Sequence, residues 1–578
     1  MLTTFKKFYS FQLKYKWRFV LFVITVLFLG IANNIQPYFF KLFVDAAPKA
    51  ELNVLLKILW MYVGFRFLEI LLDLLAYYTA DFVLIPSGRD ARLAIFKKIQ
   101  DLDMSFHISK STGSLISAIK RGDGSYWGMF HNINLQIIRI VIGFFVMLFL
   151  FSKIKIEIAL ITGVSFALNS LFIKKLIENN IKTRADFNKE EDKISAIIVD
   201  NLINFETVKL FAKEKREFKR LKNTFKVWYK KLWGYSNSFR IIDIVIGTSG
   251  NLGLFVVLLY SIFQTSKGVF TPGDLILIIT FSATFYGRFF DLLYRLRDIA
   301  KNYSDIEKYF SILDNKVAVK DPIKPLEINE VQGEIFFNKI SFSYPDTRKN
   351  ALRNFSLKIR GGQSVAFVGQ SGAGKTTIIK LLMRFYDPKT GSIEIDGRDI
   401  KLYTKDRLRS FMGVVPQEPT LFNDTIAFNI GYGLDKPNKN EIEAAAKMAN
   451  LDDFINSLPK GYKTIVGERG VKLSGGQKQR LAIARMILSN PDIVIFDEAT
   501  SHLDSETEKK IQDAFWKASV NKTTLIIAHR LSTVMKADKI VVMDKGKVKE
   551  IGTHKILIKN KNSLYRRYWK IQVNSLYD

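Results

Sequence analysis

The 578-residue sequence has no cysteine, only five histidines, and far fewer acidic than basic residues. Without cysteine it can form no disulfide, no thiolate metal site and no cysteine nucleophile. Its 86 Lys and Arg residues against 55 Asp and Glu give a formal net charge of +31. This excess is spread over both halves of the chain, so no basic arm for nucleic acid is indicated. Nearly half of the residues are hydrophobic, which excludes a disordered chain.

Long runs without charge occupy the first half of the chain. Residues 19–40 and 244–266 contain no charged side chain, in runs of 22 and 23 positions. Each run is long enough to cross about 30 Å of hydrocarbon. Four weaker apolar stretches lie at residues 54–79, 129–152, 156–173 and 275–297. The sequence therefore predicts six membrane spans.

The distribution of Lys and Arg predicts the orientation of these spans. With the N-terminus inside, the inner segments 1–18, 86–121 and 174–240 hold 29 basic residues, whereas the outer loops hold four. This bias predicts a cytoplasmic N-terminus in a cell membrane. A cleaved signal peptide is disfavoured because the first apolar run is too long. Residues 2–16 place Leu2, Phe5, Tyr9 and Leu13 on one face, as in a helix lying among lipid headgroups.

The inner segments are long and lack the Gly and Pro residues of loops, which favours helices that continue beyond the bilayer. Pro322 and Pro325 mark a linker to a second unit. We therefore expect a transmembrane domain at residues 1–320, a linker at 321–332 and a further domain at 333–578.

A phosphate-binding loop follows an apolar strand at residues 364–368. The sequence from Gly369 to Thr376 is a complete G-x-x-x-x-G-K-[ST] motif followed by a helical stretch. Its backbone N–H groups and the helix N-terminus suit the phosphates of ATP. We expect Lys375 to reach the β- and γ-phosphates and Thr376 to bind Mg²⁺. The predicted ATP-binding residues here are Gly369, Gln370, Ser371, Gly372, Ala373, Gly374, Lys375, Thr376 and Thr377.

Two further segments carry chemistry for ATP hydrolysis. A second apolar strand, residues 493–496, ends in Asp497 and Glu498, a candidate Mg²⁺ ligand and a candidate general base. Between the strands, Ser474, Gly475, Gly476 and Gln477 open a helix. A Ser-Gly-Gly turn at a helix N-terminus is an anion site, so ATP would be bound from two sides.

These motifs together resemble the ATP-binding cassette (ABC) superfamily, since LSGGQ lies upstream of the IVIFDE strand and after the phosphate loop. Six spans before one cassette resemble a half-transporter of the exporter branch. The resemblance implies a membrane α-helical domain of six long spanning helices, followed by an α/β P-loop NTPase domain with a helical signature subdomain. It also implies an ATP hydrolase coupled to transport.

The resemblance also assigns roles to single residues. Tyr344 matches the aromatic residue that stacks on adenine, although a core tyrosine is the alternative. Gln417 matches the glutamine that contacts Mg²⁺, and Asp504 matches the loop that couples the two ATP sites. His529 matches the histidine that touches the γ-phosphate, so the implied catalytic residues are Glu498, His529 and Gln417. Glu468 and Arg469 match the segment before the signature, and His502 departs from the small residue usual at its position.

Two complete sites require two copies of the chain. In the family the phosphate loop of one chain faces the signature of the other, which implies a homodimer with Ser474 and Gly476 acting in trans. Residues 106–115 and 203–211 resemble the short transverse helices that couple cassettes to spans. Solvated turns are the alternative for both segments.

Six of the charged residues within the predicted spans are candidates for a substrate cavity. Ionisable groups there are costly and usually face a cavity or one another. When residues are counted from the outer end of each span, the three arginines lie at the same depth in the bilayer, and the three acidic residues lie one or two helical turns deeper. A belt that receives an anionic or zwitterionic amphiphile is one interpretation, and mutual pairing is the favoured one. The residues are Arg66, Glu69, Asp73, Arg139, Arg288 and Asp291.

The sequence thus predicts ATP-driven export or flipping of an amphipathic lipid, drug or similar molecule by alternating access. The expected cofactors are ATP and Mg²⁺, and the expected surroundings are membrane lipid. The alternatives are a peptide exporter, an ATP-gated channel or regulator, and an importer on the same scaffold. Nucleic-acid binding is disfavoured because such cassette proteins have no spans.

Overall fold

The computed structural model describes residues 2–574 except 50–51, 111, 346, 348, 468–469, 471, 498–504 and 528–533. Some helical side chains, including those of residues 169–174 and 288–294, also lie outside the description. The chain divides into two units. The first comprises Met1–Asp101 and Lys110–Lys316, and the second comprises Leu102–Ser109 and Val317–Asp578.

The division differs from the domain limits expected from the sequence. The second unit begins at Val317 rather than after residue 332, so it includes the whole predicted linker at 321–332. It also includes the short helix α5 (Met104–Ser109), which lies between two helices of the first unit in the chain. Basic side chains of the second unit donate hydrogen bonds to the carbonyl groups of Val319, Lys320 and Ile328, so this segment packs with that unit.

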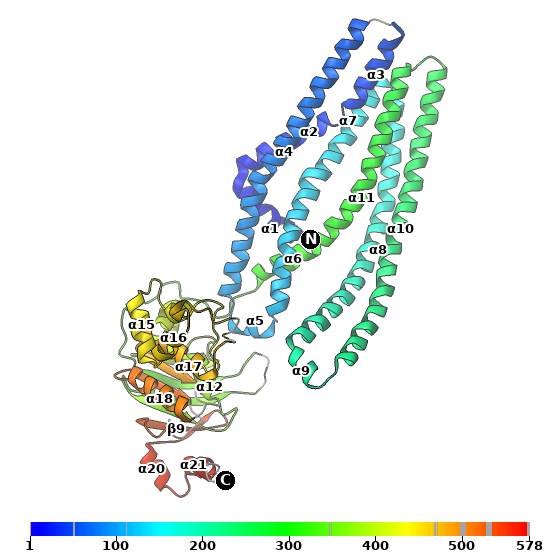
Figure 1. The fold of residues 1–578 in the computed structure, drawn as a ribbon. Helices are drawn as coiled ribbons and strands as arrows, with labels where there is room; N and C mark the ends of the chain where they lie inside the picture. The colour runs from blue at the N-terminus through cyan, green and yellow to red at the C-terminus, as the bar shows by residue number, and fades with distance from the viewer. Residues whose placement is uncertain are drawn as a thin grey trace. The chain divides into compact units, whose positions relative to one another are not determined.

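The first unit is helical (Figure 1). Its helices are α1 (Leu2–Gln12), α2 (Lys16–Ala32), α3 (Gln36–Ala46), α4 (Leu52–Asp101), α6 (Thr112–Phe130), α7 (Ile138–Ile154), α8 (Ile156–Ile203), α9 (Phe205–Leu210), α10 (Glu214–Ser266) and α11 (Pro272–Asp314). A π-helical segment, His131–Ile137, joins α6 to α7.

The long helices exceed what a bilayer needs. At 1.5 Å per residue the 50 residues of α4 extend about 75 Å, more than twice the hydrocarbon thickness. The helices α8 and α10 lie side by side and are joined by α9 (Figure 1). By length and composition alone, three described helical stretches could cross a membrane: Thr3–Ala46, Leu115–Ile154 and Glu214–Ser266. Many apolar side chains in these stretches are exposed, as lipid contact requires.

Helix α1 packs against other helices of the first unit, and Phe5 and Tyr9 of the face expected among lipid headgroups are partly buried there. Phe8, Phe11 and Gln12 are buried, whereas Leu13 is 46% exposed. Phe8 contacts the ring of Tyr126 on α6, and Phe11 stacks on Phe310 of α11. Packing against this bundle therefore selects the buried face, and a lone amphipathic pattern does not contain that information.

The second unit contains two sheets. A four-stranded antiparallel sheet has the order β2-β1-β4-β5, and a six-stranded sheet has the order β10-β9-β3-β8-β7-β6. In the larger sheet only β10 is antiparallel to its neighbour. The strands are β1 (Ile335–Phe342), β2 (Leu352–Ile359), β3 (Ser364–Val368), β4 (Thr390–Ile395), β5 (Arg398–Asp399), β6 (Met412–Val415), β7 (Ile493–Asp497), β8 (Thr523–Ile527), β9 (Lys539–Asp544) and β10 (Lys547–Gly552).

Alternate residues of the parallel strands fill two cores on opposite faces of the sheet. Val365 and Phe367 of β3 join the core shared with the antiparallel sheet and α12 (Lys375–Leu382). Ala366 and Val368 join the core beneath the helices. Those helices are α14 (Ile426–Gly431), α15 (Lys439–Met448), α16 (Asp452–Ser457), α17 (Gly475–Ser489) and α18 (Ser505–Ala518). The remaining helices are α13 (Lys405–Ser410), α20 (His554–Lys559) and α21 (Leu564–Asn574).

Candidate functional site

The loop between β3 and α12 has the backbone that a phosphate cradle needs. Gly374 has φ +102° and caps α12, a conformation that L side chains rarely adopt. A Cβ added at Gly369 would lie 2.4 Å from the carbonyl oxygen of Met543, so the loop runs too close to β9 for any side chain there. Both glycines are therefore required by the loop's path, and the N-terminus of α12 remains available to bind an anion.

Lys375 begins α12 and is 5% exposed. Its ammonium donates to the carbonyl oxygens of Gly369 at 2.7 Å and Gln370 at 3.2 Å. These bonds hold the charge within the loop, as an ATP phosphate site requires. The neighbouring Thr376 is exposed, so its hydroxyl can reach a ligand at the same helix end.

Two predicted Mg²⁺ contacts lie at one edge of the larger sheet. The parallel register pairs Val415 of β6 with Phe496 of β7 and Phe367 of β3 with Ile527 of β8. Asp497 at the end of β7 and Gln417 just after β6 therefore lie at the edge that carries the phosphate loop. With Thr376 they supply oxygen ligands of the type that Mg²⁺ prefers, so the donor set fits this ion.

Several predicted residues lie outside the described part of the chain. Glu498 directly follows Asp497, and His529 comes two residues after β8 ends at Ile527. Asp504, Glu468, Arg469 and His502 lie in other undescribed segments. Their roles remain predictions based on motif position.

Tyr344 lies just after β1 and is half-buried. Its ring contacts Phe342 and Tyr386 edge-on, with centroid separations of 5.1 and 5.4 Å. Its hydroxyl lies 3.1 Å from the Thr377 hydroxyl. The core therefore holds this ring beside the phosphate-loop helix, while part of its surface stays accessible for stacking.

The Ser474 segment forms a capping box at the start of α17. The Ser474 hydroxyl accepts from the Gln477 N–H at 3.3 Å, and the Gln477 side chain accepts from the Ser474 N–H at 2.8 Å. Ser474 and Gly475 are exposed, whereas Gly476 is buried. The exposed helix N-terminus can receive an anion from outside its own domain.

A connection not anticipated from the sequence joins this helix to the segment that contains Gln417. Gln479 on α17 is 5% exposed, and its Nε2 donates to the carbonyl oxygens of Gln417 at 2.6 Å and Pro416 at 3.2 Å. No sequence pattern indicates that Gln479 contacts Gln417, because the two residues lie 62 positions apart in the chain.

Two of the three arginines predicted to line a substrate cavity form ion pairs in the structure. Arg66 forms an ion pair with Glu69 on α4, and Arg139 Nη2 lies 2.7 Å from Asp73 Oδ1. The side chains of Arg288 and Asp291 lie outside the description. Four of the six predicted belt residues thus form two pairs, as the interpretation of mutual pairing expects.

More polar side chains lie around Arg139 than the sequence indicated. The ring of His131 stacks near Tyr77, and the guanidinium of Arg139 lies 5.9 Å from the centre of the Tyr77 ring. Arg295 of α11 donates to Asn132 at 3.5 Å. His131 and Asn132 belong to the π-helical segment, a type of distortion often found at functional sites. We call Tyr77, His131, Asn132, Arg139 and Arg295 the polar cluster.

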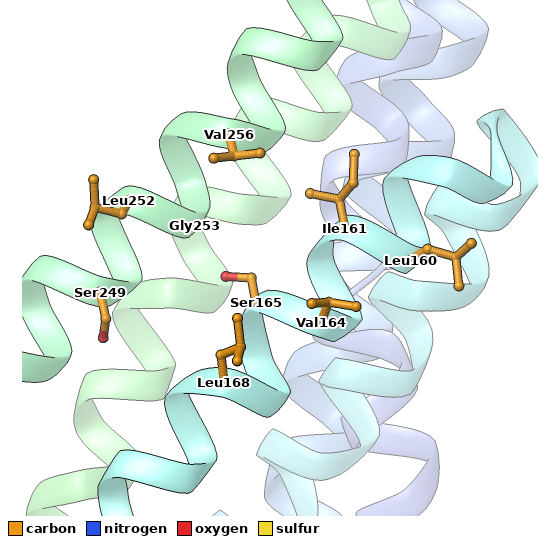
Figure 2. Close-up of a pocket in the computed structure, with 9 residues that line it drawn as sticks. All are labelled: Leu160, Ile161, Val164, Ser165, Leu168, Ser249, Leu252, Gly253 and Val256. Atoms are coloured by element: carbon orange, nitrogen blue, oxygen red, sulfur yellow. The ribbon is translucent and has the colours of Figure 1, made fainter.

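A separate apolar pocket of about 530 Å³ lies between α8 and α10. Figure 2 shows its walls, formed by Leu160, Ile161, Val164, Ser165 and Leu168 on α8 and by Ser249, Leu252, Gly253 and Val256 on α10. No charged side chain lines it. It therefore differs in chemistry from the polar cluster.

The two predicted coupling segments both contain short helices. The first forms α5 in the second unit, and the second forms α9 between α8 and α10. Around α9, Ile203, Phe205 and Leu210 are 59–77% exposed. Such an apolar tip on a polar helical extension is typical of a protein–protein contact.

Comparisons with protein families cover both units. The family described as "ABC transporter transmembrane region" matches residues 19–289, and the family described as "ABC transporter" matches residues 352–501. The second match contains the phosphate loop, the signature and Glu498.

The chain is similar to whole transporters over nearly all of its length. It is 37% identical to "ABC transporter B family member 6" of Dictyostelium discoideum, over 98% of this chain and 85% of that protein. It is 35% identical to the "ATM1-type heavy metal exporter" of Novosphingobium aromaticivorans, over 96% and 92%. By contrast, it spans only 58% of "ATP-binding cassette sub-family B member 6" of Homo sapiens.

A solved structure agrees with these relatives. The structure titled "Structure of a bacterial Atm1-family ABC exporter with ATP bound" matches with a TM-score of 0.88 and 34% identity, covering 96% of this chain and 98% of that one. The likeness confirms the fold class expected from the sequence, a helical membrane domain followed by an α/β nucleotide-binding domain.

Proposed function

We propose that this chain, which belongs to the ABC transporter family, forms a homodimer that exports an anionic amphipathic molecule. Family membership makes it an integral membrane protein that couples ATP hydrolysis to transport, and its relatives support export. We further propose that the two chains of the dimer are identical and that the substrate is an anionic amphiphile. We also propose that the protein lies in the cell membrane, with its N-terminus and nucleotide-binding domain in the cytoplasm.

ATP would be bound between two copies of the chain. Lys375 and the backbone of residues 369–374 would hold the phosphates, with Tyr344 stacked on adenine. Ser474 and Gly476 of a second copy would close the site from the other side, and Asp504 would communicate between the two sites. The exposed N-terminus of α17 supports this arrangement. The phosphate loop of the same chain belongs to a different helix, α12, so the N-terminus of α17 is free to bind the ATP of a second copy.

Hydrolysis needs an oriented water and charge stabilisation. Glu498 would polarise the water, and His529 would contact the γ-phosphate. Thr376, Gln417 and Asp497 would hold Mg²⁺, which offsets the negative charge of the phosphates. ATP binding would close the domain pair and favour an outward-open state, and phosphate release would reset it.

The polar cluster carries the proposal about the substrate. Two arginines, Arg139 and Arg295, lie there beside a π-helical turn within a predicted membrane span. Arg139 is paired with Asp73, whose side chain is 45% exposed, so an incoming anion could replace that carboxylate. Arg66, Glu69, Arg288 and Asp291 would contribute to the same inner region.

Heavy-metal export is a second candidate, favoured by the name of the Novosphingobium relative. The chain has no cysteine, and its described residues contain no group of three His, Asp or Glu side chains suited to a metal ion. A metal cargo would therefore be recognised through the anionic groups of a complex, which the polar cluster also suits.

The test is a screen of ATPase stimulation in reconstituted membranes. The probes are phosphatidylglycerol, phosphatidylcholine, Cd²⁺ alone, and Cd²⁺ with a thiol-containing dicarboxylate. We expect the anionic lipid or the anionic complex to stimulate the parent, and Arg139→Gln to lose that stimulation at unchanged basal activity. Glu498→Gln is the inactive control. Equal stimulation of Arg139→Gln and parent would contradict the proposed substrate chemistry.

A further inference from the structure

We propose that Asp103 is a positioning residue that fixes the coupling helix α5 to the phosphate-loop helix and thereby transmits ATP binding to the transmembrane helices. The connection runs through residues 317–321 at the start of the second unit, which are called the linker in this subsection. The inference rests on the proposed transport cycle. Asp103 carries no motif, and neither the sequence analysis nor the family resemblance gave it a role. All of the contacts that support the inference lie within the second unit.

The carboxylate of Asp103 binds two consecutive backbone amides of the linker. Its Oδ2 accepts from the N–H of Ala318, and its Oδ1 accepts from the N–H of Val319 at 3.2 Å. Asp103 directly precedes α5, whose Phe106 N–H donates to the Asp103 carbonyl oxygen at 3.0 Å. One residue therefore joins the first turn of α5 to the linker.

The linker itself is bound firmly to the nucleotide-binding domain. Lys405 Nζ donates to the carbonyl oxygen of Val319 at 3.1 Å, and its backbone N–H donates to Asp321 at 2.8 Å. Arg384 donates to the carbonyl oxygen of Lys320 at 2.8 Å. Val319 is 4% exposed. Residues 319–321 are therefore packed against the nucleotide-binding domain.

Arg384 connects this arrangement to the ATP site. It comes two residues after α12, the helix whose N-terminus forms the phosphate cradle. Its side chain is 4% exposed and also donates to the Tyr403 carbonyl oxygen at 3.2 Å and to Asp387 at 3.1 Å. Helix α12 thus connects the proposed ATP site at Lys375 with the linker, which is bound by Arg384 just beyond the other end of the helix. Asp103 in turn connects the linker with α5.

The geometry needs a carboxylate at position 103. Each of its oxygens accepts one of two adjacent N–H groups, and both bonds are charge-assisted. An asparagine has one acceptor oxygen, so its NH₂ group would face the second N–H donor. Asp103→Asn should therefore detach α5 from the linker with no change in side-chain size.

The test uses the absence of cysteine in the natural chain. Lys267→Cys, in the exposed turn after α10, gives one spin-label site per chain, and the distance between the two labels of the dimer is measured with and without ATP and vanadate. The variants are Asp103→Asn, Asp103→Glu and the control Asp101→Asn, an exposed carboxylate two residues away. ATP hydrolysis is measured on the same samples.

We expect Asp103→Asn to keep ATPase within about twofold of the parent while losing at least about half of the ATP-dependent change in distance. Asp103→Glu retains the charge and should keep more of this change than Asp103→Asn. A change in Asp103→Asn equal to that of Asp101→Asn would overturn the proposal. An inactive parent would contradict the proposed function instead, so the two failures are distinguishable.

Amide hydrogen exchange measures the contact between Asp103 and the linker in the absence of nucleotide. The amides of Ala318 and Val319 should exchange at least about tenfold faster in Asp103→Asn than in Asp101→Asn. If Asp103→Asn does not fold, Asp103→Glu serves in its place, and a smaller ATP-dependent change at parental ATPase is the expected result. Unaltered exchange and an unaltered distance change in that variant would again overturn the proposal.

Discussion

Gln479 and Gln417 are joined by a hydrogen bond of 2.6 Å from a buried side-chain amide to a backbone carbonyl oxygen. The first residue lies on α17, the helix capped by Ser474, and the second lies in the segment proposed to contact Mg²⁺. Within one chain, the surface proposed to bind the partner's ATP is thus attached to the sheet edge proposed to bind Mg²⁺. We expect a shift at either place to reach the other through this buried contact.

This contact gives a first prediction. Gln479→Glu replaces the donating amide with a carboxylate that repels the carbonyl oxygens of Gln417 and Pro416. We expect a loss of about 1–3 kcal/mol in stability and about a tenfold loss of ATPase rate, measured by thermal unfolding and phosphate release. Lys478→Gln, one residue earlier on the same helix, is the control. Parental values in Gln479→Glu would refute a coupling role.

The second prediction concerns the proposed general base. Glu498→Gln should reduce ATPase by at least about 100-fold, because a positioned base contributes about 10²–10⁴ to the rate. ATP affinity should be retained, since the phosphate loop is unaltered. Glu418→Gln, a change of the same size beside Gln417, should hydrolyse ATP at a near-parental rate. If Glu498→Gln does so too, the base has been assigned wrongly.

The prediction of the ATP site depends on information that is local in the sequence. The phosphate loop is continuous from Gly369 to Thr376, and an apolar strand must precede it for the glycines to lie at a sheet edge. The family match and the solved relative then confirmed the fold and the coupling of ATP hydrolysis to transport.

Contacts between distant segments could not be predicted in this way. The bonds from Asp103 to the linker join residues 215 and 216 positions apart, and Gln479 joins a segment 62 positions away. The burial of Phe8 and Phe11 on α1 could not be predicted for the same reason, since it depends on their contacts with Tyr126 and Phe310. The π-helical turn at His131 also has no pattern in the sequence that would indicate it.

The third prediction concerns pH. His554 Nδ1 lies 2.8 Å from the Tyr565 hydroxyl, and burial raises the pKa of Tyr565 to about 12, so that hydroxyl keeps its proton at neutral pH. Burial lowers the pKa of His554 below its usual value. The unfolded chain therefore binds a proton at a higher pH than the folded chain, and stability falls as the pH drops below about 6.5.

Thermal unfolding of the parent and His554→Gln measures this effect. The stability of the parent relative to the variant should be greatest above neutral pH and should shrink on acidification, because glutamine does not titrate. A difference that stays constant across this range would show that the protonation of His554 is not coupled to folding.

The fourth prediction distinguishes structural pairing from substrate binding at Arg139. If its pairing with Asp73 only holds helices together, Arg139→Gln and Asp73→Asn should each destabilise the protein, and the double variant should recover about 0.5–3 kcal/mol of the summed loss. Under our proposal, the double variant also loses stimulation by anionic lipid or anionic complex. Recovery of both stability and stimulation would favour a purely structural pair.

The most direct test of the account is whether ATP is held between two copies of the chain. One chain carries Ser371→Cys and a second, differently tagged, carries Ser474→Cys; both positions are exposed, and the natural chain has no cysteine to compete. Mixed chains in the Glu498→Gln background are oxidised with and without ATP. The account predicts an ATP-dependent disulfide between the two tags and none within either chain alone, whereas mixed chains that never cross-link in the presence of ATP would contradict it.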